Sequence, residues 1–210
     1  MDIVNYLTNI YGYDTPIFLK DVRIGRKSKA AIKEEFYRAV KQGKLKRESN
    51  GIYYVKSDKE FAGISFSQIL KDKFLYSDNV NAGFRDLFIE GYYSGLTFLN
   101  IIGLSQQVPA VLEITTNKTS SKKRFFEVGK LRACIRKSRT TITFQNYKML
   151  QFLDMFNFIS FDEVKDNKEL LEQYIKSNYL TKKQFSEYIG LYSNRTFKKI
   201  ESNGIDKFFI

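Results

Sequence analysis

The sequence predicts an α+β protein whose helices gather towards its two ends. Three observations predict this class. Apolar residues recur at helical spacing at the start and over the last third of the chain, strand-like runs lie between residues 108 and 137, and a hairpin signal follows a long helix near residue 50. We expect two domains: a small one at residues 1–57, and a mixed α/β domain at residues 58–210 in which residues 157–210 form a helical extension.

The first domain is organised around a basic helix that we expect to begin after Ser28. The Ser28 hydroxyl is a good N-cap, since it can accept a hydrogen bond from a free amide in the first turn. Ile32, Phe36 and Ala39 then recur at helical spacing and form one apolar face. Gly43 follows, and glycine ends helices readily because it adopts the left-handed cap conformation without steric penalty.

A β-hairpin is predicted directly after this helix. Its strands are expected at Lys44–Glu48 and Ile52–Val55, and the link between them contains Asn50-Gly51, a strong hairpin signal. Ahead of the basic helix we expect a first helix over Met1–Ile10, a short strand at Ile17-Phe18 and a short second helix over Leu19–Ile24.

Helix, strand, helix, basic helix and hairpin are, in this order, the elements of a winged helix-turn-helix domain. In such a domain the third helix enters a DNA major groove and the hairpin lies over phosphates. The polar side chains suit this role, and the candidate DNA-binding residues are Lys27, Ser28, Lys29, Lys33, Tyr37, Arg38 and Lys41 of the helix and Lys44, Lys46, Arg47 and Asn50 of the hairpin. The alternative is a solvated, charged helix on an ordinary domain.

Composition narrows the classes of function. A net charge of +12 over 210 residues favours an anionic partner, with nucleic acid ahead of a membrane surface. No run is apolar enough to span a bilayer and no leader precedes the first helix, so we expect a cytoplasmic protein. The chain has no histidine and a single cysteine, Cys134, which we interpret as a core residue. Serine–histidine and cysteine–histidine catalysis are therefore excluded, and we expect neither a metal site nor a cofactor.

A second basic segment covers residues 118–148, with ten lysines and arginines against the single acid Glu127. We expect strands at Arg124–Val128 and Leu131–Lys137, preceded by a strand at Val108–Thr115 and a hairpin loop at Asn117–Lys123. The segment either forms a second surface for DNA or RNA or is a solvated hairpin face. The residues of this candidate surface are Lys122, Lys123, Arg124, Lys130, Arg132, Arg136, Lys137 and Arg139. Phe125 and Phe126 would stack on bases or belong to the core.

The rest of the second domain is predicted to be mostly helical. We expect helices over Phe66–Tyr76, between Leu96 and Gly103, and from Thr143 to Phe156, with a loop at Asp78–Gly83. Three further helices are expected at Asp166–Tyr179, Thr181–Ile189 and Asn194–Glu201, followed by an apolar C-terminal tail that docks on a core or joins an oligomer contact.

The central segment resembles a known family. The runs Gly91-Tyr92-Tyr93-Ser94-Gly95-Leu96-Thr97-Phe98-Leu99-Asn100, Gly103-Leu104, Gln107-Val108-Pro109 and Glu113-Ile114-Thr115-Thr116-Asn117-Lys118 resemble the AbiEi-type antitoxins of bacterial type IV toxin–antitoxin, or abortive infection, systems. Ile142-Thr143 and Leu150-Gln151-Phe152-Leu153-Asp154 fit the same pattern. The resemblance reaches to about Asp154, and the helices after Phe156 match nothing in it.

The resemblance implies a transcriptional autorepressor and antitoxin that is not an enzyme. It implies that the winged helix binds inverted repeats in double-stranded DNA of its own promoter. It also implies that the second domain counteracts a nucleotidyltransferase-like toxin without a stable complex. Two alternatives remain open from the residues. One is a DNA-binding adaptor without antitoxin activity, and the other is a Mg²⁺-dependent nuclease that uses the set Asp86, Glu90, Glu113 and Lys118. The structural alternative for Glu113 is a strand residue that pairs with an arginine and has no catalytic role.

Overall fold

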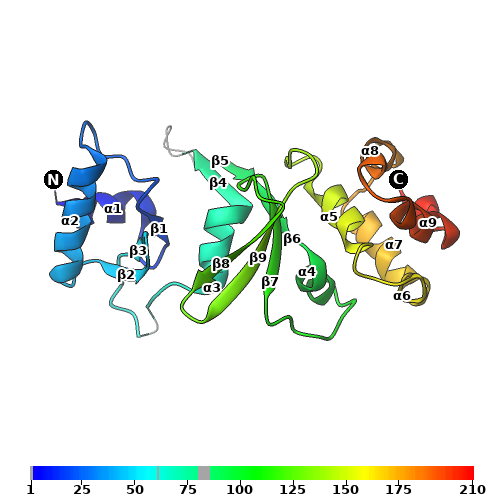
Figure 1. Ribbon diagram of the computed structural model, residues 1–210, viewed down its shortest axis with the longest axis horizontal. Coiled ribbons are helices and arrows are strands. Elements are labelled where there is room, and N and C mark those ends of the chain that lie inside the picture. Colours follow the sequence, from blue (N-terminus) through cyan, green and yellow to red (C-terminus); the bar gives the residue numbers. More distant parts are fainter. Residues whose placement is uncertain (1, 61, 80–85) are drawn as a thin grey trace. The chain divides into compact units, whose positions relative to one another are not determined.

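The chain forms a mixed α+β structure with helices towards both ends, which confirms the predicted class (Figure 1). The computed structural model describes residues 2–60, 62–79 and 86–210. It divides into two compact units. Unit 1 comprises Met1–Lys73 and Val128–Leu131, and unit 2 comprises Phe74–Glu127 and Arg132–Ile210.

Unit 1 holds the basic helix and the hairpin. Its elements are α1 (Ile3–Tyr11), β1 (Ile17–Phe18), α2 (Lys29–Lys41), β2 (Lys46–Ser49), β3 (Ile52–Tyr54) and α3 (Phe66–Leu70). The three strands form an antiparallel sheet in the order β1-β3-β2. The predicted first helix, first strand, basic helix and hairpin are therefore all confirmed to within a few residues.

The local sequence explains these elements. The Ser28 hydroxyl accepts a hydrogen bond from the amide of Ala31 at 3.2 Å, as an N-cap should. At the hairpin, Gly51 has a φ of +75°, a backbone conformation that glycine adopts without strain. Phe36 of α2 is fully buried and meets Tyr53 of β3 edge to face, with ring centroids 4.9 Å apart. This contact joins the apolar face of α2 to the sheet.

The helix predicted over Leu19–Ile24 is wrong, because this segment forms only a turn. Its backbone groups have partners elsewhere: the amide of Leu19 donates to the carbonyl of Gly51 at 3.0 Å, and the carbonyl of Arg23 accepts from the Tyr6 hydroxyl at 2.6 Å. Val22 is the only fully buried side chain in the segment. A six-residue helix with so little to bury does not offset its nucleation cost.

Unit 2 contains a central sheet and a helical C-terminal half. A π-helical turn, η1 (Lys71–Leu75), follows α3 in the chain. The elements after it are β4 (Tyr76–Asn79), β5 (Asp86–Ile89), β6 (Gly91–Tyr93), α4 (Gly95–Ile101), β7 (Leu112–Thr116), β8 (Lys123–Val128), β9 (Leu131–Lys137), α5 (Tyr147–Met155), α6 (Phe161–Asp166), α7 (Lys168–Ser177), α8 (Lys182–Tyr188), η3 (Ile189–Leu191), α9 (Asn194–Ser202) and η4 (Ile205–Phe208).

The four-stranded sheet has the order β6-β7-β9-β8, so β9 lies between two strands that precede it in the chain. β7 and β9 are parallel, with Leu112 opposite Ala133 and Thr116 opposite Lys137. The prediction of a hairpin loop at Asn117–Lys123 is therefore wrong. These residues connect β7 to the edge strand β8, which is not its neighbour in the sheet. The true hairpin joins β8 to β9. Local turn residues do not reveal such a crossover, because the chain on either side has the composition of ordinary strands.

Several boundaries also differ from the prediction. The strand expected from Val108 begins at Leu112, and Val108 itself is highly exposed. The loop expected at Asp78–Gly83 is a strand at its first two residues, which end β4, and residues 80–83 lie outside the described residues. Strands β5 and β6 and helix α6 were not predicted. Each is short, and short elements carry too few residues to show a period.

The helical half is built around buried aromatic and aliphatic side chains of α5 and α7. The apolar C-terminal tail docks on this core. Phe209 stacks on Phe185 with centroids 4.7 Å apart, and the amide of Ile210 donates to the carbonyl of Leu180 at 3.0 Å. No helix in the described part of the chain has both the length and the apolar character needed to cross a membrane.

Candidate nucleic-acid interface

One flank of α2 presents lysines and a tyrosine to solvent. Lys29, Lys33, Tyr37 and Lys41 follow one another at a spacing of four residues, so they form one stripe along the helix. All four are exposed, Tyr37 to 62%. Among the described residues, none of the three lysines forms an ion pair with a carboxylate. Tyr37 does not pack into the core, so its hydroxyl and its charged neighbours face outward together.

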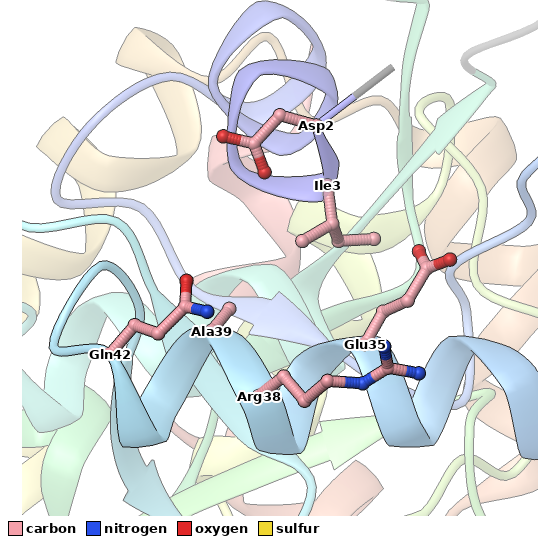
Figure 2. Close-up of a pocket in the computed structure, with 6 residues that line it drawn as sticks. All are labelled: Asp2, Ile3, Glu35, Arg38, Ala39 and Gln42. Carbon is pink, nitrogen blue, oxygen red and sulfur yellow. The ribbon is translucent and has the colours of Figure 1, made fainter.

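The opposite flank of α2 is mixed in charge. Arg38 pairs with Glu34 at 3.5 Å, and Glu35 pairs with Lys27 at 2.6 Å. Glu35 and Arg38 also line a small, open depression beside the first residues of α1, as Figure 2 shows. Two predicted DNA contacts, Lys27 and Arg38, therefore have acidic partners within the protein, unlike the lysines of the stripe.

The hairpin adds a second exposed basic group. Lys44, Lys46, Arg47 and Asn50 are all exposed. The Arg47 guanidinium donates to the side-chain oxygen of Asn50 at 3.2 Å and to the carbonyl of Ser49 at 3.4 Å. These bonds hold the Arg47 side chain against the turn of the hairpin and leave its charge without a carboxylate partner among the described residues.

The second predicted surface is divided by the structure. Arg136 pairs with Glu113 at 3.0 Å, which confirms the prediction that Glu113 is a strand residue paired with an arginine. Arg139 points towards the helical half of unit 2, where it lies 3.5 Å from Asp154 and donates to the carbonyl of Leu191 at 3.2 Å. Both arginines hold parts of unit 2 together. The remaining six residues of the predicted surface, Lys122, Lys123, Arg124, Lys130, Arg132 and Lys137, are exposed.

Three of the exposed side chains meet on β8 and β9. The Arg132 guanidinium lies over the Phe125 ring, 3.5 Å from its centroid, and the Lys123 ammonium lies 5.4 Å from the same centroid. Phe125 remains 44% exposed. Phe126, on the other face of β8, instead packs edge to face on Phe74 at 5.2 Å. Of the two phenylalanines that the sequence offered for base stacking, only Phe125 is therefore placed for it.

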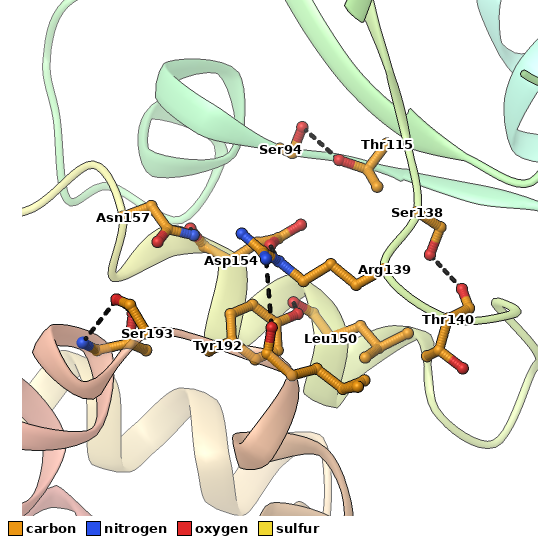
Figure 3. Close-up of polar contacts among 12 residues, drawn as sticks. Ser94, Thr115, Ser138, Arg139, Thr140, Leu150, Asp154, Asn157, Tyr192 and Ser193 are labelled. Atoms are coloured by element: carbon orange, nitrogen blue, oxygen red, sulfur yellow. Dashed lines mark hydrogen bonds and ion pairs between the residues drawn. The ribbon is translucent and has the colours of Figure 1, made fainter. Parts of the chain in front are cut away.

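A buried polar cluster joins the sheet of unit 2 to its helices. The hydroxyl of Tyr92 in β6 donates to Asp154 of α5 at 2.7 Å. The Arg139 guanidinium lies 4.7 Å above the Tyr192 ring, next to Asp154 (Figure 3). Burial is the main cause that raises the pKa of the Asp154 carboxyl, while the bond from Tyr92 and the charge of Arg139 act in the other direction. Burial likewise raises the pKa of Tyr92 well above its usual range. Asp154 belongs to the sequence pattern of the central segment, but no spacing indicated that it would be buried.

The carboxyl and phenol groups of the cluster are buried and already have hydrogen-bond partners. Asp154 and Tyr92 are both more than nine-tenths buried, and the Tyr192 hydroxyl is occupied by the Leu150 carbonyl at 3.1 Å. The neighbouring bond from Thr115 to Ser94, at 3.0 Å, is also buried. These groups satisfy one another, as buried polar groups must. We therefore interpret the cluster as a structural clamp.

Lys199 is the most deeply buried lysine that the structure describes, and it too has a structural role. Its ammonium donates to the carbonyl of Phe156 at 2.7 Å and to that of Ile159, just after the end of α5. Burial lowers the pKa of this lysine. A cation at a helix C-terminus satisfies carbonyls that have no partner in the helix.

The residues proposed for a nuclease have separate partners. Glu90 accepts hydrogen bonds from Ser77 at 3.1 Å and Asn117 at 3.0 Å, Glu113 is paired with Arg136, and Lys118 donates to the carbonyl of Tyr76. The side chain of Asp86 lies outside the described residues. Over the ranges that the structure describes, no three acidic or cysteine side chains group as ligands of a metal ion.

Comparison with known proteins adds no relative from which a role could be transferred: no protein-family model, no curated protein and no solved structure matches this chain.

Proposed function

We propose that the protein is a DNA-binding transcriptional autorepressor, and that it is the antitoxin of a type IV toxin–antitoxin system. One observation carries the DNA-binding part. The stripe of Lys29, Lys33, Tyr37 and Lys41 on α2 is free of internal acidic partners among the described residues, and the basic hairpin follows α2 after a short turn.

The topology of unit 1 supports a winged-helix interpretation. α1, β1, α2 and the β2–β3 hairpin occur in the winged-helix order, and β1 pairs with β3 as the third strand of the small sheet. The turn at residues 19–21 takes the place of the second helix. In this proposal α2 enters a major groove, where Lys33 and Tyr37 reach base edges, and Lys46 and Arg47 of the hairpin engage phosphates.

The antitoxin part rests on the resemblance of residues 91–118 to AbiEi-type antitoxins. The structure gives physical roles to several residues of that pattern. A side chain at Gly91 would lie 2.5 Å from the Phe74 carbonyl oxygen, and Tyr92 holds Asp154. These are roles in folding, so they support a shared fold more directly than a shared activity. The proposed counterpart is a nucleotidyltransferase-like toxin, which the antitoxin counteracts without a stable complex.

The DNA-binding proposal is tested by fluorescence anisotropy with duplex DNA from upstream of the gene and with a shuffled duplex, across a salt series. We expect the upstream duplex to bind more tightly. The double variant Lys29→Ala/Lys33→Ala should lose this preference and lower the slope of log K against log salt by about two, since each phosphate contact contributes roughly 0.9 to the slope.

A matched control removes the same charge elsewhere. Lys165→Ala/Lys183→Ala changes two exposed lysines of α6 and α8 and should keep the preference for the upstream duplex. If this control weakened binding as much as the α2 variant, only the net charge would matter, and the proposed interface on α2 would be wrong.

A growth assay separates the antitoxin from a DNA-binding adaptor. Cells that express a nucleotidyltransferase-like toxin encoded beside this gene should be rescued by the wild-type protein and also by the Lys29→Ala/Lys33→Ala variant, because neutralisation is assigned to unit 2. If neither protein rescued growth while the wild type still repressed the promoter, the protein would be a DNA-binding adaptor without antitoxin activity.

A further inference from the structure

One face of the central sheet in unit 2 is covered over one half and charged over the other. Glu113 of β7 lies opposite Cys134 of β9, so alternation along β9 places Arg132 on the same face. α4 packs against β7 and α5 against β6, and these helices cover the β6–β7 half. The other half is formed by β9 and the edge strand β8 (Figure 1). It carries Arg132, Phe125 and Lys123.

The Phe125–Arg132 stack on this half is an unusual use of an edge strand. Charged side chains on an edge strand discourage pairing between chains, but that role requires no aromatic ring. Here the central carbon of the Arg132 guanidinium lies 3.5 Å from the ring centroid, yet Phe125 remains 44% exposed. A planar cation that lies over an exposed aromatic ring forms the kind of platform on which an unpaired base stacks.

The surrounding charge favours a polyanion. Of the ten basic side chains of residues 118–148, six on or next to β8 and β9 are exposed: Lys122, Lys123, Arg124, Lys130, Arg132 and Lys137. The segment contains one acid. That acid, Glu127, lies beside the stack and pairs with Arg132 at 3.1 Å. The Lys123 ammonium, 5.4 Å from the Phe125 centroid, has no carboxylate partner among the described residues, and Lys122 before it in the chain is exposed. The ion pair also fixes the orientation of the guanidinium plane, so less freedom is lost when a base stacks on it.

We propose that the β8–β9 face centred on Phe125 and Arg132 binds single-stranded RNA. An unpaired base stacks on the Phe125–Arg132 platform, and Lys122 and Lys123 contact the flanking phosphates. A duplex does not offer a free base face, whereas loops and ends of folded RNA do. The site lies outside the interface proposed on α2, and RNA binding there does not depend on the repressor and antitoxin functions.

The proposal is tested with the full chain and fluorescein-labelled twelve-nucleotide probes: single-stranded RNA, DNA of the same sequence, and the RNA duplex. Phe125→Leu keeps the bulk of the side chain but removes the π-face, and Arg132→Lys keeps the charge but removes the guanidinium plane. Because stacking on an aromatic or guanidinium plane supplies a large part of the affinity for an unpaired base, each variant should weaken binding of single-stranded RNA about tenfold. Neither variant should change the slope of log K against log salt.

Two controls separate stacking from charge and from the operator site. Lys183→Ala, on α8, should leave RNA binding within about twofold of wild type. Lys29→Ala/Lys33→Ala should weaken the upstream DNA duplex and spare the RNA, while Phe125→Leu should do the reverse. Thermal melting of both platform variants checks that the fold is intact, as expected for substitutions on an exposed strand face.

Three results would overturn the proposal. If Phe125→Leu bound the RNA as tightly as the wild type does, binding would depend on phosphate contacts alone and not on stacking. Equal binding of the duplex or of polyglutamate would show a general polyanion surface, and equal binding of single-stranded DNA would remove the assignment to RNA.

Discussion

Gly95, the first residue of α4, occupies a position where an added side chain would meet the carboxylate of Glu113. Its φ is +58°, and an added Cβ would lie 1.4 Å from an oxygen of the Glu113 carboxylate. Glu113 is held there by the ion pair with Arg136 of β9. The glycine therefore lets a charged pair on the sheet lie against the start of a helix, which gives a physical reason for the Ser-Gly-Leu-Thr run of the sequence.

Gly95→Ala should destabilise the protein by about 2–4 kcal/mol, because it adds a steric conflict to the roughly 1–2 kcal/mol cost of a left-handed alanine. Gly103→Ala is the matched control, since Gly103 has a φ of +80° but no atom within 4 Å of the added Cβ. It should show only the backbone cost. Urea unfolding followed by circular dichroism measures both, and equal losses in the two variants would show that the contact with Glu113 is irrelevant.

At the scale of elements, the sheet and the helices of unit 2 are joined by three polar side chains, of which Tyr92 and Asp154 are buried and Arg139 is partly exposed. Tyr92 comes from β6, Asp154 from α5, and Arg139 from the segment after β9. The net effect of these surroundings is a raised pKa of the Asp154 carboxyl, with burial as the dominant cause. The folded protein therefore holds a proton on Asp154 more tightly than the unfolded chain does.

This proton has a consequence for stability that Asp154→Asn exposes. Stability contributed by a raised pKa is present below the unfolded value, here about 3.8, and is lost as the pH rises through the folded value. The free energy of unfolding of the wild type should therefore fall relative to that of Asp154→Asn across this window and become parallel above it. Urea titrations at intervals from pH 3.5 to about pH 8 measure this difference. If the free energy of unfolding of the wild type instead rose with pH relative to that of Asp154→Asn, Arg139 and Tyr92 would outweigh burial in setting the pKa of Asp154.

The helix α2 shows how one element separates two kinds of side chain. Its apolar face, with Ile32 and Phe36, belongs to the core of unit 1. Of its two polar flanks, one carries internal ion pairs and the other carries the stripe of Lys29, Lys33, Tyr37 and Lys41. A helical period of 3.6 residues produces this division directly from the order of the residues.

At the scale of the whole molecule, the chain has two compact units with separate cores. Phe36 belongs to the core of unit 1, and Phe209 belongs to that of unit 2. Substitutions at sites that share no packing partners are close to additive, so a defect in one core should remain local.

Hydrogen exchange monitored by mass spectrometry tests this independence. Phe209→Leu should accelerate exchange of the amides of α5, α7 and α8 and leave α1 and α2 as in the wild type. Phe36→Leu should do the opposite. Leucine keeps both variants below the roughly 3–5 kcal/mol loss of a buried phenylalanine truncated to alanine. Faster exchange throughout the chain in either variant would show that the two units unfold as one.

The sequence by itself determined the elements whose signals are local. The basic helix after Ser28, the Asn50-Gly51 hairpin, the strands of the second basic segment and most of the C-terminal helices follow from caps, periodicity and turn residues, which act over a few neighbouring positions. The candidate residues on α2 could also be read from the sequence, because a helix assigns its faces by spacing alone. Cys134, expected in the core, is buried.

The tertiary structure decided what depends on distant parts of the chain. It reduced the segment at residues 19–24 to a turn, inserted β9 between β7 and β8, and paired Arg136 and Arg139 of the second basic segment with Glu113 and Asp154. It also brought Arg132 onto the Phe125 ring. These outcomes depend on which strands become neighbours and which charges become buried, and both are set by burial of the whole core rather than by the local run of residues.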